Sequence, residues 1–324
     1  MARRSNELSV EELTEINRKE KSYVSDWNEA VRIFLKDCEL RNLREHTVRY
    51  YRNELNTVQK HLQEQNVSGD PSSMTEEHIK RYIIGYMRRE GLKISSINSR
   101  LRAVRAMFNF LYSQNYIGSN PVKGLKLLKD RRQIIATFSR QQVKQLLSQP
   151  NLRTFTGIRD YTMMLLLLET GIRANEFVSL NLTDVKIEES VIHVRNAKGN
   201  QERIVPITSI MKKQLKKYSS IRGYVETDAL FITLDNNRLS KRQLQNIISK
   251  YGKAAGIKDV RCSPHTFRHT FARMAVENGA GTFELQAILG HSSLEIVKVY
   301  VNLFSDDVKA KHKTFSPLKG IDIR

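Results

Sequence analysis

The hydrophobic pattern of the chain changes within a short basic stretch, residues 118–137, and this change limits the possible folds more than any other feature. Before it, apolar residues recur at three- and four-residue spacing, as in segments 27–35 and 101–111, which is typical of amphipathic helices. After it, helical segments alternate with short runs rich in β-branched residues. These runs are 184–187, 191–194 and 203–205. The pattern predicts a mainly α chain with a small antiparallel sheet, an α+β protein of two domains.

Local signals place the helices. In the first domain, a break at 68–71 and the capping-box-like Thr75-Glu76-Glu77-His78 predict four or five helices. In the second, expected helices span 139–147 and 157–169, with a stop at Gly171, and others begin at Ser240, where Gln243 suits a capping box, and at Pro264. The expected segments are a polar N-terminal segment (1–22), a helical domain (23–117), a basic linker (118–137), a second domain (138–304) and a C-terminal tail (305–324).

The net charge of +20 points to a polyanionic partner. Residues 1–120 carry 20 basic and 16 acidic side chains, so most of the excess lies in the second part. Nucleic acid is favoured over a membrane surface because no basic amphipathic anchor stands out, and the apolar run 163–168 is too short to cross a bilayer. The N-terminus has no signal-peptide pattern, and two isolated cysteines suit a reducing compartment, so a cytoplasmic protein is expected.

Several basic residues are candidates for contact with DNA. They are Arg100, Arg102 and Arg105 of the predicted helix that begins at 94, Lys126, Arg131 and Arg132 of the linker, and Lys241 and Arg242 at the start of a later helix. A solvated basic face explains the helix arginines equally well, and the linker is either a solvated connector or a segment that crosses a phosphate backbone.

Two arginines stand where helices begin. Arg173 follows the Gly171 stop and shares a helical face with Glu176, an arrangement that is more often a local ion pair than an active site. His265 and Arg268 lie three residues apart after Pro264, so an imidazole and a permanently charged bidentate donor project from one face and suit a phosphate. His269 lies about 100° further round the helix and is interpreted as a structural or supporting histidine.

A later segment combines a histidine with a tyrosine. His291 and Tyr300 would point to opposite sides of one unbroken helix, but Gly290 and the pair Ser292-Ser293 permit a break that lets them converge. The chain has twelve tyrosines, so a packing role is the default interpretation of any one of them.

Five motifs in this order resemble the tyrosine recombinases of the lambda-integrase and Xer family. They are Gly171–Glu176, the turn lysine Lys198 within 197–206, His265–His269, Leu289–Ser293, and Tyr300 nine residues after His291. The resemblance implies an N-terminal helical core-binding (SAM-like) domain and a C-terminal catalytic domain that form a C-shaped clamp on DNA.

The resemblance also implies roles for single residues. Arg173 and Arg268 would hold the scissile phosphate, His265 and His291 would complete that clamp, and Glu176 and His269 would support it. Lys198 would protonate the leaving 5′ oxygen, and Tyr300 would form a 3′-phosphotyrosyl intermediate. No metal or other cofactor is implied, because protein cations supply the charge.

The partners implied are two double-stranded DNA recombination sites, a homotetramer in the synaptic complex that passes through a Holliday junction, and accessory DNA-bending or directionality proteins, in the cytoplasm at the nucleoid. The tail 305–324 docks either on its own domain or in trans on a neighbour. Segment 311–318 resembles the corresponding part of mobile-element recombinases more than that of housekeeping Xer proteins. The resemblance implies a role in integration, excision or transposition, with housekeeping resolution of chromosome or plasmid dimers as the alternative.

Three functions outside this family compete with that interpretation. A DNA-binding regulator explains the charge but not the positions of Lys198, His291 and Tyr300. A type IB topoisomerase shares the tyrosyl chemistry without strand exchange, and a metal-dependent nuclease needs clustered carboxylates that the sequence does not show.

Overall fold

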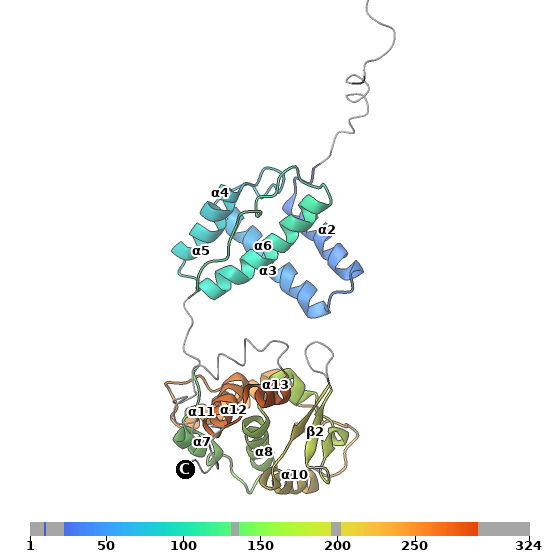
Figure 1. The fold of residues 1–324 in the computed structure, drawn as a ribbon, viewed down its shortest axis with the longest axis vertical. Helices are drawn as coiled ribbons and strands as arrows, with labels where there is room; N and C mark the ends of the chain where they lie inside the picture. Colours follow the sequence, from blue (N-terminus) through green and yellow to red (C-terminus); the bar gives the residue numbers. More distant parts are fainter. Residues whose placement is uncertain (1–9, 11–22, 131–135, 196–201, 291–324) are drawn as a thin grey trace, which may run out of the picture. The chain divides into compact units, whose positions relative to one another are not determined.

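The computed structural model describes residue 10 and residues 23–130, 136–195 and 202–290. The chain divides into two compact units, residues 1–133 and 134–324. Figure 1 draws both units coloured by sequence. The mainly helical class with one small sheet, expected from the periodicity, is confirmed.

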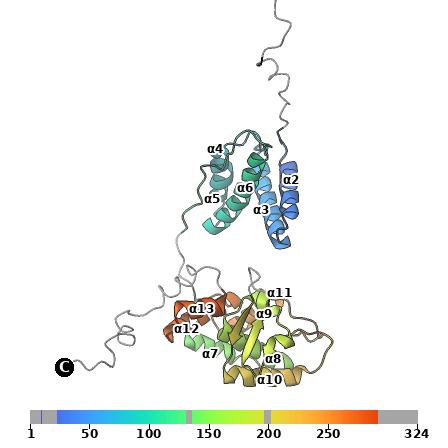
Figure 2. The same cartoon turned by 45° about the vertical axis from the view of Figure 1, so that its right-hand side comes forward.

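The first unit is helical throughout its described part. Its elements are α2 (Trp27–Leu40), α3 (Glu45–Glu64), α4 (Glu76–His78), the π-helical turn η1 (Ile79–Gly85), α5 (Tyr86–Arg89) and α6 (Ile94–Ser113). Helices α2, α3 and α6 pack against one another, and Figure 2 shows them side by side. The Thr75 hydroxyl accepts a hydrogen bond from the His78 amide, so the predicted capping box begins α4.

One apolar core holds the first unit together. Trp27, Phe34 and Phe108 are almost completely buried in it. The Trp27 indole nitrogen also donates to the Leu55 carbonyl (3.3 Å), which satisfies its polar group within the core.

Part of the expected linker packs on this core. Val122 and Leu125 are buried in it, and the Asn98 side chain exchanges two hydrogen bonds, both 2.9 Å, with the backbone of Leu128. The stretch 118–128 therefore belongs structurally to the first unit.

The second unit combines one small sheet with helices. Its elements are α7 (Arg140–Leu147), α8 (Phe155–Thr170), α9 (Ala174–Val178), η2 (Leu182–Asp184), β1 (Val185–Lys186), β2 (Val191–Val194), β3 (Arg203–Pro206), α10 (Ser209–Arg222), α11 (Lys241–Ala254), α12 (Pro264–Glu277) and α13 (Thr282–Leu289). The strands form an antiparallel sheet of order β1-β2-β3, in which Ile192 pairs with Val185 and Val205.

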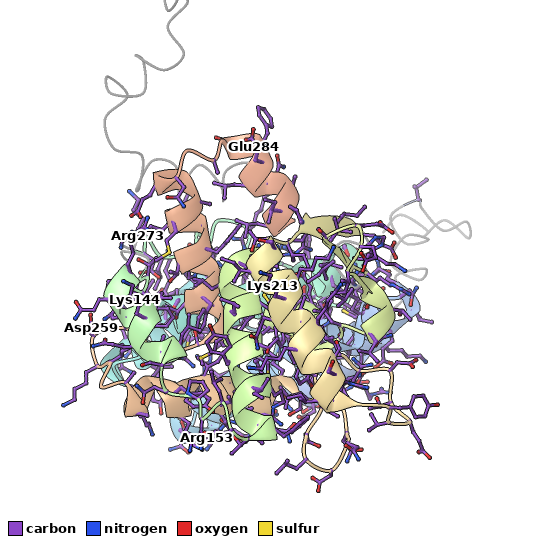
Figure 3. All side chains as sticks on the ribbon, turned by 90° about the horizontal axis from the view of Figure 1, so that it is seen from below. Lys144, Arg153, Lys213, Asp259, Arg273 and Glu284 are labelled. Carbon is purple, nitrogen blue, oxygen red and sulfur yellow. The ribbon has the colours of Figure 1, made fainter. Side chains whose placement is uncertain are left out.

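Helix α8 is the centre of the second unit. Figure 3 shows it between α7, which carries Lys144, and α10, which carries Lys213, and α12 packs against it as well. Its apolar run, including Met163 and Leu167, is buried, which explains a stretch of hydrophobic residues without strict periodicity. A separate small cluster, Ala272, Val276, Leu285 and Leu289, joins α13 to α12.

Capping residues begin the later helices as predicted. Ser240 and Gln243 form the expected capping box at the start of α11, and Pro264 occupies the first turn of α12. No helix among the described residues is long and apolar enough to cross a membrane.

Candidate functional site

A left-handed glycine positions the first candidate arginine. Helix α8 ends at Gly171, whose φ is +57° and whose amide donates to the Leu167 carbonyl (3.0 Å). A Cβ at this position would lie 2.6 Å from Cδ1 of Phe271 and 2.9 Å from Cδ2 of Leu289. Only glycine fits both the conformation and the space, so the turn that leads to Arg173 at the start of α9 is tightly specified.

Arg173 and Glu176 form the pair that their spacing predicts. The Arg173 amide donates to Oε2 of Glu176 (2.9 Å), and its Nη1 donates to Oε1 (3.0 Å). The Glu176 side chain is only 2% exposed, whereas that of Arg173 is 25% exposed. The arginine therefore keeps access to solvent while its carboxylate partner lies beneath it.

Arg203 of β3 holds the same carboxylate from another element. Its Nη1 and Nη2 donate to Oε1 (3.2 Å) and Oε2 (2.7 Å) of Glu176. Burial alone would raise the pKa of Glu176, but the hydrogen bonds and charges of Arg203 and Arg173 outweigh that effect and hold the pKa below its ordinary range. Glu176 is therefore ionised at neutral pH.

The C-terminal end of α13 gathers three guanidinium groups. Nη2 of Arg268 and Nη1 of Arg173 donate to the Leu289 carbonyl (2.8 and 3.4 Å), and Nη2 of Arg173 donates to the Gly290 carbonyl (3.0 Å). Nε of Arg203 donates to the Ile288 carbonyl (2.7 Å). The last carbonyls of a helix lack partners within the helix and carry the negative end of its dipole, so they attract these cations.

Arg268 is fixed on two sides. Besides its bond to Leu289, its Nη1 donates to the Gly171 carbonyl (2.7 Å), and the residue is 4% exposed. Because one carbonyl accepts from both Arg173 and Arg268, the structure brings together the two arginines that the sequence analysis placed on one phosphate.

The two histidines of α12 are biased towards their neutral forms. Desolvation and the charges of Lys241, Arg268, Arg261 and Arg173 lower the pKa of His265, although its residue is exposed overall. Burial, with smaller effects of His265 and Arg268, lowers the pKa of His269 to about 4. Both rings are therefore largely neutral at pH 7 and can accept a proton.

Some predicted residues lie outside the described ranges. These are Lys198, His291 and Tyr300 of the catalytic set, Arg131 and Arg132 of the linker, and the tail 305–324. In the parts that the structure describes, no group of three or more His, Cys, Asp or Glu side chains could hold a metal ion.

The candidate DNA contacts differ in how accessible they are. Arg102, Lys126, Lys241 and Arg242 are exposed, and Arg105 is half-buried. Arg100 has a side chain only 18% exposed, which lies 3.5 Å from the carboxylate of Glu54 and donates to the Ser96 carbonyl. This arginine joins α6 to α3 and is less available to a phosphate than Arg102.

Arg203 was not among the predicted site residues. The sequence places it only in an expected strand and in the motif around Lys198. The structure turns Arg203 and Val205 inward and leaves Ile204 58% exposed. Alternation along the strand places Arg203 on the same face as the buried Val205, and this was the available signal. The more apolar Ile204 instead favours the interpretation in which Ile204 faces inward and Arg203 faces solvent.

Two protein-family models match this chain. The model of the phage integrase family matches residues 136–306, and that of the phage integrase N-terminal SAM-like domain matches residues 34–115. Tyrosine recombinase XerC of Thermodesulfovibrio yellowstonii is 32% identical over 266 residues, covering 80% of this chain and 86% of that protein. Tyrosine recombinase XerD of Staphylococcus haemolyticus is 27% identical, covering 86% and 94%.

Solved structures share the fold. The Tn1549 transposon integrase in complex with transposon right end DNA matches with a TM-score of 0.70 at 20% identity, covering 89% of this chain and 99% of that one. The XerH recombinase bound to a palindromic difH substrate also gives 0.70, at 18% identity, covering 92% and 91%.

Proposed function

The chain belongs to the phage integrase family and is a tyrosine recombinase that cleaves and rejoins DNA, and from this premise we propose that it exchanges strands between two recombination sites with Tyr300 as the nucleophile. The observation that carries the proposal is the meeting of Arg173 and Arg268 on the Leu289 carbonyl, two residues before His291. Two guanidinium groups that could share one phosphate therefore contact the same carbonyl, and this supports the proposal.

Arg173 and Arg268 hold the non-bridging oxygens of the scissile phosphate. A guanidinium group stays charged and presents parallel N–H donors that match two phosphate oxygens. Their contacts with Glu176, Gly171 and the end of α13 orient both groups before DNA arrives, so little reorganisation is needed when charge develops on phosphorus.

The reaction is a transesterification. The Tyr300 oxygen bonds to phosphorus and loses its proton, the bond to the 5′ oxygen breaks, and Lys198 protonates that oxygen. His265 and His291 complete the phosphate clamp and accept or pass on the proton that leaves the Tyr300 hydroxyl, and His269 supports His265. Attack by the 5′ hydroxyl of a partner strand reverses these steps and releases Tyr300, so the phosphodiester energy is conserved. The positive charge comes from side chains, so we expect cleavage to proceed in EDTA.

Both units contribute to the DNA interface. Arg102, Arg105 and Lys126 of the first unit and Lys241 and Arg242 of the second are the described candidates for phosphate contacts, with Arg131 and Arg132 in the connecting segment. The exchange is completed by a homotetramer on two sites, through a Holliday junction, with accessory DNA-bending or directionality proteins as further partners.

A cleavage assay tests the clamp. Arg173→Ala and Arg268→Ala should each lower single-turnover cleavage of a nicked suicide duplex by at least about 10²-fold, with DNA binding retained, by analogy with the removal of one transition-state donor. Arg102→Ala is the control and should weaken binding while leaving cleavage at saturating protein unchanged. Cleavage by Arg173→Ala and Arg268→Ala at the wild-type rate would contradict the assignment of these two arginines to the scissile phosphate.

For the biological role we propose strand exchange for a mobile element, which segment 311–318 supports. The XerC and XerD relatives favour a second candidate, housekeeping resolution of chromosome or plasmid dimers. Sequencing the DNA that becomes covalently attached to the protein in its host separates the two. Junctions at the ends of an integrated element support the first role, and junctions at one chromosomal site without such an element support the second.

A further inference from the structure

Arg203 reaches the end of α13 beside the clamp arginines, and the proposed mechanism gives it no role. Its side chain is 8% exposed. Its three donor nitrogens are engaged, Nη1 and Nη2 by the Glu176 carboxylate and Nε by the Ile288 carbonyl. All three of its side-chain nitrogens therefore bind protein acceptors, whereas the neighbouring Arg173 keeps a side chain that is 25% exposed.

We propose that Arg203 is a positioning residue for DNA cleavage, which fixes Glu176, and through Glu176 fixes Arg173, against the C-terminal end of α13. This inference rests on the proposed function, because it depends on Arg173 contacting the scissile phosphate.

The carboxylate of Glu176 is shared between two elements. Oε1 accepts from Nη1 of Arg173 and Nη1 of Arg203, and Oε2 accepts from the Arg173 amide and Nη2 of Arg203. Without Arg203, the contact between Arg173 and Glu176 would be a local one between residues three apart, which orients a half-buried arginine only weakly. The bidentate contact from β3 stops the carboxylate from turning, so Arg173 has a fixed partner.

A second anchor closes the arrangement. Arg203 and Arg173 both bridge Glu176 to the last turn of α13, one at the Ile288 carbonyl and the other at the carbonyls of Leu289 and Gly290. Gly290 makes room for this, because a Cβ there would lie 2.8 Å from Nη1 of Arg203. Arg203 therefore links β3 to the end of α13.

The charge of Arg203 has a consequence that simple packing would not have. The groups that hold Glu176 ionised against its burial are Arg203 from β3 and Arg173 from α9. Removal of Arg203 should raise the pKa of Glu176, and protonation of Glu176 releases the ionic contact with Arg173. The acid limb of the cleavage rate should then move to higher pH. His265 and His269 of α12 also titrate on the acid side, so a comparison in a Glu176→Gln background identifies the group responsible.

The experiment measures single-turnover cleavage of a nicked suicide duplex, carrying the recombination site mapped from covalent adducts, between pH 5 and 8. Arg203→Gln should lower the cleavage rate about 10- to 100-fold at pH 7.5, because a small misplacement of a catalytic group costs this much in rate. The affinity for DNA should change less than about threefold. The acid limb of Arg203→Gln should move up by about one pH unit, a shift typical of the loss of one close charge partner. Arg203→Lys keeps the positive charge but cannot make the bidentate contact with Glu176. Compared with Arg203→Gln, it should return the acid limb to its wild-type position and recover part of the cleavage rate.

Two controls separate positioning from folding. Arg222 is also a buried arginine, but it donates to the carbonyls of Ala229 and Thr227 and is not among the groups that hold Glu176. Arg222→Gln should lower the thermal midpoint and leave the acid limb unmoved. In a Glu176→Gln background, Arg203→Gln should lower the rate less than about threefold, because its partner is already removed.

The outcomes distinguish this inference from the function on which it rests. If Arg173→Ala cleaves at the wild-type rate, the proposed function fails. If Arg173→Ala loses cleavage but Arg203→Gln cleaves like the wild type, only the positioning role is overturned. The positioning role is overturned as well if Arg203→Gln has its full effect without Glu176. Should Arg203→Gln fail to fold, Arg203→Lys decides: a rate at least about fivefold below wild type supports the role, and an unchanged rate overturns it.

Discussion

Three guanidinium groups and one carboxylate at the end of α13 leave an excess of positive charge where the chain turns towards His291. Glu176 is buried and ionised between Arg173 and Arg203, and Arg268 is held by backbone carbonyls. Backbone dipoles orient these cations without neutralising them. A phosphate diester would bring the counter-charge that this set of residues lacks.

The neutral state of His269 predicts a pH dependence of stability. Its pKa is about 4 in the folded protein and near 6.5 when unfolded, so the unfolded state binds the proton first as pH falls. Stability should be unaffected above about pH 6.5 and should decline between pH 6.5 and 4, by about 1 kcal/mol after allowance for partial solvent access to the ring. Thermal unfolding from pH 7.5 to 5 should show a falling midpoint, and the fall should be smaller in His269→Gln, where His265 still contributes. An equal slope in the variant would refute the assignment to this histidine.

Two helices of the second unit end at left-handed glycines that face the same site. Gly171 ends α8 and Gly290 ends α13, with φ of +57° and +62°. One glycine places Arg173, and the other carries a carbonyl to which Arg173 donates. The two glycines that end these helices therefore also set the position and the hydrogen bonds of Arg173.

Gly171→Ala tests this connection. The substitution meets backbone strain of about 1–2 kcal/mol and, in addition, a clash with Phe271 and Leu289, so it should cost more than strain alone and should lower the cleavage rate. Gly256→Ala is the matched control, with φ of +71° and no atom within 4 Å of an added Cβ. It should lower the thermal midpoint modestly and leave cleavage unchanged. Equal effects of the two variants on the cleavage rate would show that the end of α8 at Gly171 does not position the site.

The elements differed in how well the sequence predicted them. Local signals were sufficient for the Gly171 stop, the Ser240 cap and the strand runs, because each depends on neighbours in sequence. Helix α10 was not predicted, although Met211, Leu215 and Tyr218 have helical spacing and are buried. The Arg173–Glu176 pair was predictable, but Arg203 was not, because its contact with Glu176 spans 27 residues and depends on the phase of β3.

At the scale of the whole molecule, the net charge of +20 predicts that the affinity for DNA falls as the salt concentration rises. Each phosphate that a basic side chain neutralises releases a counterion and contributes about −0.9 to the slope of log affinity against log salt on duplex DNA. Titrations between about 50 and 300 mM salt should give a steep slope, reduced by about one in Arg102→Ala. A nearly flat dependence would mean that the charge lies away from the interface.

The tail is the second prediction at this scale. Residues 305–324 carry Val308, Phe315, Leu318 and Ile321, which a short tail cannot bury by itself. We expect the tail to dock in trans on a neighbouring protomer. Truncation before Ser305 should then leave binding to a single site nearly intact and abolish synapsis of two sites, as measured by native gel analysis. Recombination by the truncated protein at full efficiency would exclude trans docking.

The role of Tyr300 as the nucleophile is the central claim, and formation of a covalent protein–DNA adduct on a nicked suicide substrate tests that role directly. Tyr300→Phe removes one hydroxyl, so we predict specific DNA binding equal to that of the wild type and no adduct. In the wild type, peptide mapping should find the nucleotide on Tyr300. Adduct formation by Tyr300→Phe at the wild-type rate, or a nucleotide on another residue, would contradict the central claim.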